Sequence, residues 1–321
     1  MIRSIGAFLG KFTTYSCLIC AAAAVVSSLP ARAETTATYE NGTIHISFTQ
    51  FTKETDTARR IDLSGKLRML SQRVVSDACF VQTGIANNDI VPNLRATISE
   101  VGAIAHALEY GDTNLGIFDA EERRKTLAVL AQFNEIWAPM QINALLIAQG
   151  EGTFDDILAL NTQSAELLQV SHMLVSTVAA QYFDPTQMRL ADAMLIDIAE
   201  RQQFLAQQIA KNTCLASSSI ATESMTEELW SARMAFNSTM GALSSGMPSL
   251  GIQAPPTTKI DASLNAVRSA WLEMRQPIDA QLSGDMLDQS QLAAIFYGAD
   301  DMTNQMSGVI GLYAQASRFG S

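Results

Sequence analysis

Apolar residues recur at helical spacing through the segment that begins near residue 53. When each residue is advanced by about 100° around a helix axis, five apolar side chains fall within one arc roughly 60° wide. These residues are Leu63, Leu67, Leu70, Val74 and Val81. A stripe of this kind is typical of a helix that buries one face in a core. The segment from about Lys53 to Ala86 is therefore predicted to be a long amphipathic helix.

The opposite face of this predicted helix is also poor in charge. It carries Ile61, Ser64, Arg68, Val75 and Cys79, so it is small, partly apolar and has a single cation. A solvent-exposed helix face normally carries more charge than this. We therefore expect the second face to pack against another part of the protein.

Glycine and proline positions divide the rest of the chain into further helices. Gly111, Gly150, Gly246 and Gly284 follow periodic segments, as glycines at helix C-termini do. Asp184-Pro185 supplies an N-cap and a first-turn proline. The chain is predicted to form helices at about 53–86, 90–110, 119–149, 153–182, 186–215, 222–245, 259–283 and 288–317. Because β-branched alternation is scarce outside residues 43–51, the predicted fold class is all-α.

One segment of the chain occurs twice. IDLSGKLRMLSQRVVSDAC covers residues 61–79 and IDIAERQQFLAQQIAKNTC covers residues 196–214, at a constant offset of 135. Two repeats are too few for a solenoid, so we predict two tandem up-down-up-down four-helix bundles. In this prediction an N-terminal extension at 34–52 precedes copy 1 at 53–184 and a degenerate copy 2 at 185–321.

The first 33 residues have the composition of a secretory signal peptide. Arg3 and Lys11 precede an apolar run from Cys17 to Leu29, and Ala31-Arg32-Ala33 is typical of a cleavage site after Ala33. The run is too short for a membrane span, so the mature protein is expected to be periplasmic or secreted and not membrane-spanning. Loss of this leader, with its three basic and no acidic residues, would take the formal charge from −11 to −14. Such an acidic chain is a poor partner for nucleic acid.

The phrase DTARRIDLSGKLRMLSQR, from Asp56 to Arg73, resembles the N-terminal sensor domain of type IV pilus methyl-accepting transducers, the PilJ-type family. It is also similar to the periplasmic domain of nitrate and nitrite sensor kinases, whose first helix carries Gly-x-x-Arg-Met-x-Ser-x-Arg. The corresponding positions here are Gly65, Arg68, Met69, Ser71 and Arg73.

This resemblance implies helical bundles that sense a small ligand, with no catalytic activity and no cofactor. In nitrate-sensing relatives the signature arginine of each of two subunits meets one anion at the dimer axis. Arg68 is the matching residue in the first copy, and the second copy has Gln203 at that position.

If the two copies pack like a family dimer, the first helices of the two copies meet across a pseudo-twofold axis. Arg68 would then face Gln203, and Cys79 would approach Cys214, either as a disulfide or as two buried free thiols. The candidate ligand-binding residues are Arg68, Ser64, Ser71, Gln72, Gln203 and Arg201. An arginine with a glutamine amide could still hold a planar anion through their N–H groups. Alternatively, the site has changed its ligand or no longer binds one.

The sequence offers little sign of other chemistry. His45, His106 and His172 have no second ligand at the helical spacing of a metal pair, and neither a phosphate loop nor a nucleophile elbow is present. We therefore expect no metal site and no enzyme. The expected function is a periplasmic sensor-like protein that binds a small anion such as nitrate or nitrite and reports to a membrane-bound kinase or chemoreceptor. The alternative is a structural or adaptor protein of the cell envelope, or of pilus-associated signalling, that binds no ligand.

Overall fold

The computed structural model describes residues 36–40, 43–47, 49–85, 89–183 and 189–319 of the 321-residue chain. The expected signal peptide at residues 1–33 lies outside the described residues, as does the expected boundary between the copies at 184/185. By its internal contacts the chain divides into two units, Met1–Glu54 and Thr55–Ser321. Each unit is described by itself.

In the first unit two short strands pair as an antiparallel hairpin. β1 (Thr36–Glu40) and β2 (Thr43–Ser47) are in register, with Thr38 opposite His45. β2 lies within the stretch of the sequence that shows β-branched alternation, which favours an extended backbone.

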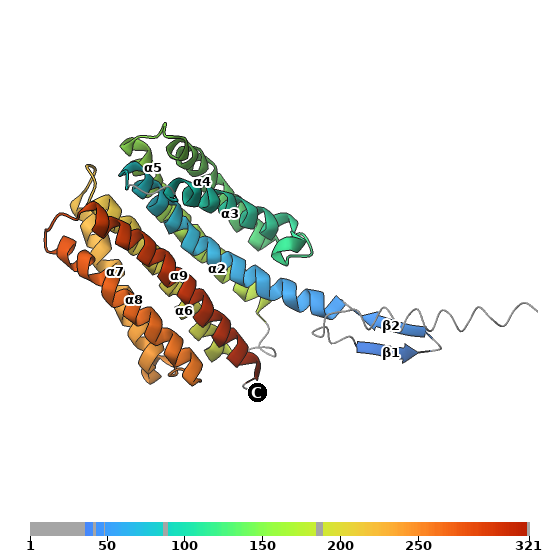
Figure 1. Ribbon diagram of the computed structural model, residues 1–321. Coiled ribbons are helices and arrows are strands. Elements are labelled where there is room, and N and C mark those ends of the chain that lie inside the picture. Colours follow the sequence, from blue (N-terminus) through green and yellow to red (C-terminus); the bar gives the residue numbers. More distant parts are fainter. Residues whose placement is uncertain (1–35, 41–42, 48, 86–88, 184–188, 320–321) are drawn as a thin grey trace, which may run out of the picture. The chain divides into compact units, whose positions relative to one another are not determined.

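The second unit is built from α-helices joined by short turns (Figure 1). The first set comprises α2 (Thr49–Gln82), described here from Thr55 on, α3 (Ile90–Tyr110), α4 (Arg124–Gln149) and α5 (Phe154–Tyr182). The second set comprises α6 (Leu190–Ala216), α7 (Glu223–Ser245), α8 (Thr258–Leu282) and α9 (Gln289–Phe319). The predicted all-α fold of two tandem helical bundles is therefore confirmed.

The observed start of α4 differs from the predicted one. The helix begins at Arg124 and not near residue 119. The carboxylate of Glu121 accepts hydrogen bonds from the backbone N–H groups of Glu122 and Arg123, at 3.0 Å and 2.8 Å. The Glu121 side chain therefore binds backbone N–H groups that would otherwise belong to the first turn of the predicted helix.

A repeated turn confirms the internal repeat. After α3, Gly111 has φ of 84°, and a short 3-10 helix, η1 (Thr113–Leu115), follows. After α7, Gly246 has φ of 74°, and a second 3-10 helix, η2 (Pro248–Leu250), follows. A Cβ atom at Gly246 would lie 2.7 Å from the backbone nitrogen of Ala254, so only glycine fits this turn.

Both faces of α2 are buried. Leu67, Leu70 and Val74 of the apolar stripe are 0% exposed, and so are Val75 and Cys79 of the opposite face. The stripe lies in the hydrophobic core of the second unit. The second face packs against the other repeat, as its low charge predicted.

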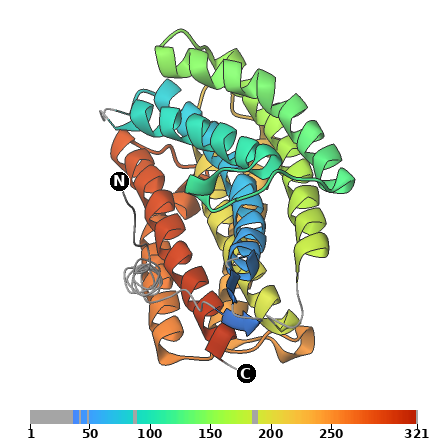
Figure 2. The same ribbon diagram turned by 90° about the vertical axis from the view of Figure 1, so that its right-hand side faces the viewer.

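The first helices of the two sets, α2 and α6, lie in direct contact. A disulfide joins Cys79 of α2 to Cys214 of α6, with 6.2 Å between the two Cα atoms. α2 also contacts α9, because the rings of Phe80 and Phe296 pack edge to face with centroids 5.2 Å apart. In Figure 1 and Figure 2, α2 runs alongside helices of both sets.

We expect the variant Cys79→Ser/Cys214→Ser to be less stable than the wild type. The disulfide spans 135 residues, and closing a loop of this length is worth about 4–5 kcal/mol in the chain-entropy model. For a domain of this size the thermal midpoint should fall by roughly 10–15 °C, measured by circular dichroism. Wild-type protein in dithiothreitol should melt like the variant. Free thiols at both positions in non-reducing peptide mass mapping would contradict this bond.

Candidate functional site

Arg68 lies buried at the contact between α2 and α6. Its side chain is 2% exposed, and its two terminal nitrogens donate to different acids. Nη1 donates to Oδ1 of Asp197 at 3.0 Å, and Nη2 donates to Oε2 of Glu200 at 3.1 Å. Both acids belong to α6, so an arginine of the first copy binds carboxyl groups of the second. We call Arg68, Asp197 and Glu200 the seam cluster.

Three further side chains surround the seam cluster. Nε of Arg201 donates to Oδ2 of Asp197 at 3.0 Å. The Phe204 ring lies 5.9 Å from Cζ of Arg68, within the range of a cation–π contact. The ring of His172, on α5, meets Phe204 edge to face with centroids 5.6 Å apart. The guanidinium of Arg68 is therefore enclosed by acids on one side and by an aromatic ring on another.

Gly65 makes room for the carboxyl group of Glu200. A Cβ atom at this position would lie 2.6 Å from Oε2 and 3.1 Å from Cδ of Glu200. The offset of 135 aligns Gly65 with Glu200 itself, and aligns Arg68 with Gln203. The second copy has thus exchanged the signature glycine for an acid, and this acid packs over the glycine and against the arginine of the first copy.

The two acids of the seam cluster differ in protonation. Burial raises the pKa of Asp197, but the charges of Arg68 and Arg201 outweigh burial and hold this pKa below its ordinary value. For Glu200 burial outweighs the attraction of Arg68 and raises the pKa from 4.5 to about 8. Near neutral pH, Asp197 therefore carries the charge that balances Arg68, while Glu200 holds a proton. The pKa of His172 is lowered, first by burial and then by the two arginines.

Three predicted site residues on α2 do not reach the seam cluster. Ser64 Oγ and Ser71 Oγ each donate to the backbone carbonyl three residues earlier, both at 2.8 Å. Gln72 Nε2 donates to Ser71 Oγ at 3.2 Å and to a backbone carbonyl of α5 at 3.5 Å. These polar groups therefore form their hydrogen bonds within α2 or with the neighbouring helix α5.

The expectation that Gln203 faces Arg68 is wrong. Its Nε2 donates to the Thr303 carbonyl at 3.0 Å and to Ser307 Oγ at 2.7 Å, and both acceptors belong to α9. Glu200 precedes Gln203 by three residues, which rotates a side chain by about 60° around the helix axis. That rotation turns Gln203 onto α9 and leaves Glu200 facing α2.

Arg73, the last arginine of the signature, belongs to a second buried network. Its Nη2 donates to Asp300 of α9 at 2.9 Å, and Gln207 of α6 donates to the same carboxyl group at 3.1 Å. Its Nε lies 3.6 Å from Oδ2 of Asp77, which also accepts a hydrogen bond of 2.6 Å from Thr97. Burial raises the pKa of Asp77 to about 7, although Arg73 opposes the shift. This network ties α2 to α3, and together with Gln207 it ties the first copy to the second.

Among the residues that the structure describes, no group of three or more His, Cys, Asp or Glu side chains could hold a metal ion. Within the same part of the chain, no helix combines the length and the apolar character needed to cross a bilayer.

The fold and the seam define a class of protein: a tandem pair of four-helix bundles that meet through their first helices. The family model described as "Type IV pili methyl-accepting chemotaxis transducer N-term", PilJ, matches residues 50–172 and 186–295. The chain belongs to this family and carries two copies of its domain. A comparison with curated proteins found no match. The resemblance inferred from residues 56–73 is confirmed, and so is the relation to chemotaxis transducers.

Asp197 and Glu200 are not among the site residues predicted from the sequence, although a signal was present. In the alignment of the two copies, Glu200 stands opposite Gly65. The second copy has glutamic acid in place of the signature glycine, and three residues later it has glutamine in place of the signature arginine. The two changes together suggest that the new acid of the second copy pairs with the arginine that only the first copy keeps. The disulfide shows that the helices bearing these residues are paired, which brings the acid to the remaining arginine.

We expect Gly65→Ala and Glu200→Ala to be energetically coupled. In the wild-type background the new methyl group displaces Glu200 from Arg68. In the Glu200→Ala background it has room, and the helix gains about 0.5–1 kcal/mol. A double-mutant cycle measured by urea unfolding should give a coupling of about 1–2 kcal/mol. Gly102→Ala is the matched control, because a Cβ there meets nothing within 4 Å. A coupling near zero would contradict the close fit of Gly65 and Glu200.

The protonation of Glu200 predicts a pH dependence of stability. Its pKa is about 8 in the folded protein against an ordinary value of 4.5, so the folded state binds an extra proton between these values. The free energy of unfolding should therefore fall as pH rises from about 5 to 8, by at most about 1.4 kcal/mol per pH unit for this group. Asp77 acts in the same direction.

The variant Glu200→Gln isolates this contribution because its side chain cannot ionise. Urea unfolding at several pH values should show a smaller slope for Glu200→Gln than for the wild type. Glu166→Gln, at an exposed position of α5, should keep the wild-type slope. Equal slopes for the wild type and Glu200→Gln would show that Glu200 is ionised throughout this range.

Proposed function

We propose that this chain is a transducer-type signalling module of the cell envelope, which docks as a preformed pseudo-dimer on a membrane-bound chemoreceptor or sensor kinase. It acts by binding and not by catalysis. The observation that carries the proposal is the seam cluster. The resemblance to nitrate sensors implies that Arg68 stands at the position where two subunits would hold an anion, and here Asp197 and Glu200 of the same chain bind it.

The burial of the seam cluster supports a module that is closed without a ligand. Arg68 is 2% exposed and the Glu200 side chain is 11% exposed. An external anion would have to displace Asp197 or Glu200 from the guanidinium. Displacement of Glu200 leaves its buried carboxyl group without a partner, which is costly in a protein interior. The Asp197 side chain is 38% exposed, but its displacement leaves the buried guanidinium of Arg68 dependent on the incoming anion. The contact between α2 and α6 therefore persists without an external ligand.

The disulfide supports the periplasmic or secreted location expected from the leader. Disulfides persist in oxidising compartments and are rare in the cytosol. The bond between Cys79 and Cys214 also holds α2 and α6 together independently of the seam cluster. A module of this kind meets its receptor with the pseudo-dimer already formed.

The second candidate function is the sensing of nitrate or nitrite at Arg68, which stays a prediction. One observation favours it: in the described part of the chain, the buried Nε of Arg68 has no hydrogen-bond partner. One N–H group of the guanidinium is thus left for an additional acceptor, such as an oxygen of a planar anion.

Calorimetric titration of nitrate and nitrite at pH 7 separates the two functions. For a seam closed by its own acids, we expect no heat of binding in the wild type or in Arg68→Ala. The variant Asp197→Asn/Glu200→Gly removes both acids and gives the second copy the glycine of the first. This variant should bind nitrate or nitrite, and the binding should be lost again when Arg68→Ala is added.

Binding of nitrate to the wild type that disappears in Arg68→Ala would overturn the closed seam and establish an anion sensor. Arg68→Gln, which introduces the residue of the second copy, serves as an independent variant at this position. The disulfide keeps α2 and α6 joined in every variant, so a lost signal reports on the site and not on separation of the helices.

A further inference from the structure

The outward side of α7 and α8 carries large apolar side chains. Trp230 and Met234 lie one turn apart on α7 and are 55% and 44% exposed. Leu272 of α8 is 53% exposed. It precedes Asp279 by two helical turns, and Asp279 accepts a hydrogen bond of 2.6 Å from Arg233 of α7. Leu272 therefore lies on the edge of α8 next to α7, and we call Trp230, Met234 and Leu272 the outer patch.

The outer patch belongs to the second copy alone. The offset is 135 for α7 and 134 for α8, where Trp271 aligns with Trp137. At the places of Trp230, Met234 and Leu272 the first copy therefore has Arg95, Ser99 and Ala138. All three differences enlarge the exposed apolar surface of the second copy. Exposed apolar side chains that gather in one patch indicate a surface for contact with another protein.

The outward face of α7 continues with small residues. Beyond Met234 its exposed positions are Ser238, Gly241 and Ser245, spaced by three or four residues. A Cβ atom at Gly241 would meet nothing within 4 Å, so the fold of one chain does not require glycine there. Glycine within a helix is nevertheless less stable than alanine by about 0.5–1 kcal/mol. This cost is explained if another molecule must approach the helix closely.

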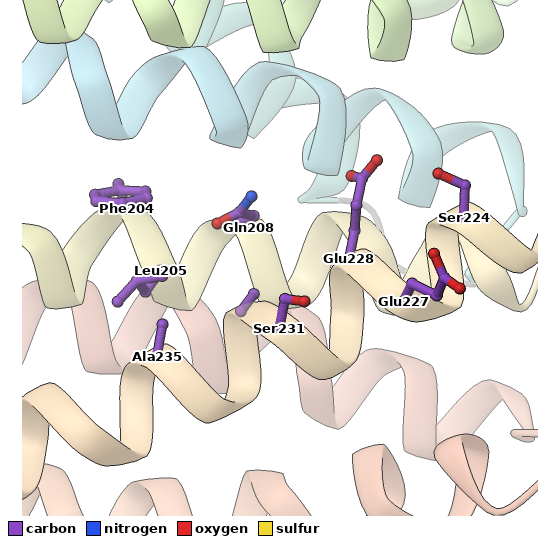
Figure 3. A pocket seen from close by; sticks show the side chains of 9 residues that line it. Phe204, Leu205, Gln208, Ser224, Glu227, Glu228, Ser231 and Ala235 are labelled. Atoms are coloured by element: carbon purple, nitrogen blue, oxygen red, sulfur yellow. The ribbon is translucent and has the colours of Figure 1, made fainter.

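The same face carries no charge. The acidic residues of α7 lie in its first two turns, where Glu227 and Glu228 line a groove between α6 and α7 (Figure 3). Beyond Trp230 the one charged residue of α7 is Arg233, and it is paired with an acid of α8. The second face of α2 has a similarly low charge, and it packs against a helix of the other copy. We therefore expect the outward face of α7 to pack against a helix as well.

The order of large and small residues makes this face complementary to itself. If two α7 helices pack antiparallel about an axis near Ser238, Trp230 lies opposite Ser245 of the partner subunit. Met234 then lies opposite Gly241 of the partner subunit. The two large side chains of each helix fill the space left by the two small residues of the other. A symmetric contact between identical chains requires a surface that is self-complementary in this way.

Electrostatic complementarity favours the same arrangement. Arg268 lies one turn from the α8 residue of the outer patch, and it is exposed, with no hydrogen bond or ion pair among the described residues. Trp271 Nε1 donates to Asn237 at 2.8 Å, and this contact and the one from Arg233 fix the level of α8 relative to α7. Arg268 is then level with about residues 240–244 of α7. Antiparallel pairing brings its guanidinium beside the ring of Trp230 of the partner subunit, where a cation–π contact stabilises the pair.

We propose that the outer patch and the small residues beyond it join two molecules of this protein into a symmetric dimer with antiparallel α7 helices. The contact is confined to one helix and the edge of its neighbour, which is small for a protein interface. We therefore expect a dissociation constant in the micromolar range, about 1–100 μM. This dimer goes beyond the proposed function, because neither Arg68 nor a receptor takes part in it.

Sedimentation equilibrium of the full chain across the micromolar range tests the dimer. The wild type should pass from monomer to dimer as its concentration rises. Gly241→Glu places a charge opposite Met234 of the partner subunit, so it should weaken dimerisation about tenfold or more. Because glutamate is a better helix former than glycine, the thermal midpoint of the monomer should not fall. Gly308→Glu adds the same charge at an exposed glycine of α9 with equally open space, and it should dimerise like the wild type.

Trp230→Arg provides a second variant, because it introduces the residue of the first copy. It should also weaken dimerisation about tenfold or more. In the wild type, Trp137 and Trp271 are buried, so a blue shift of indole fluorescence with rising concentration reports on Trp230. A wild type that stays monomeric at every concentration would overturn the proposal and leave the outer patch to a different partner. A dimer whose affinity neither Gly241→Glu nor Trp230→Arg changes would overturn it as well.

Discussion

The contact between the two copies depends on one constraint: the buried guanidinium of Arg68 needs hydrogen-bond acceptors. Arg68 lies at the contact of two helices, where an unpaired charge would be costly, and the second copy supplies both carboxyl groups that it binds. This requirement explains the glycine at position 65, because the absence of a side chain there leaves space for the carboxyl group of Glu200. It also explains why α2 and α6 must pack at close range, and this packing brings Cys79 within bonding distance of Cys214. The two copies are therefore held by polar contacts, a covalent bond and apolar packing at one interface.

The two copies of the domain have diverged in complementary ways. In the first, Arg73 and Asp77 fill the space beside the first helix with a buried polar network. In the second, Gln208 and Asn212 stand at the same places; Gln208 lines a groove between α6 and α7, and Asn212 is buried. The second copy also lost its seam arginine and gained an acid that serves the arginine of the first. The equivalent helix pairs of the two copies, α2 with α3 and α6 with α7, thus carry a polar network in one copy and a groove in the other.

Much of the fold follows from local features of the sequence. The stripe of Leu67, Leu70 and Val74 predicts the buried face of α2, and the equivalent glycines at 111 and 246 predict equivalent turns. The weak charge of the opposite face predicts a packed helix. The partner of Arg68 was not predictable in the same way, because a rotation of about 60° decides whether Gln203 or Glu200 faces it. Glu121 shows the same difficulty. It lies within the predicted helix at 119–149, but in the structure it is buried before the start of α4, accepts a hydrogen bond from Tyr182 at 2.8 Å and lies 3.7 Å from Arg60. Periodicity identifies which residues are inside, whereas tertiary contacts decide which residues meet.

The bond between Cys79 and Cys214 has a consequence for symmetry. A dimer of identical chains presents every surface twice, and each inherited substitution alters both halves at once. Here a single chain provides both halves in a fixed one-to-one ratio, so each half can change alone. The outward surfaces of the two bundles are then released from the requirement to be the same. The two ends of the pseudo-dimer axis therefore carry different surfaces, and one half can change at its surface while the other half keeps the contact between α2 and α6.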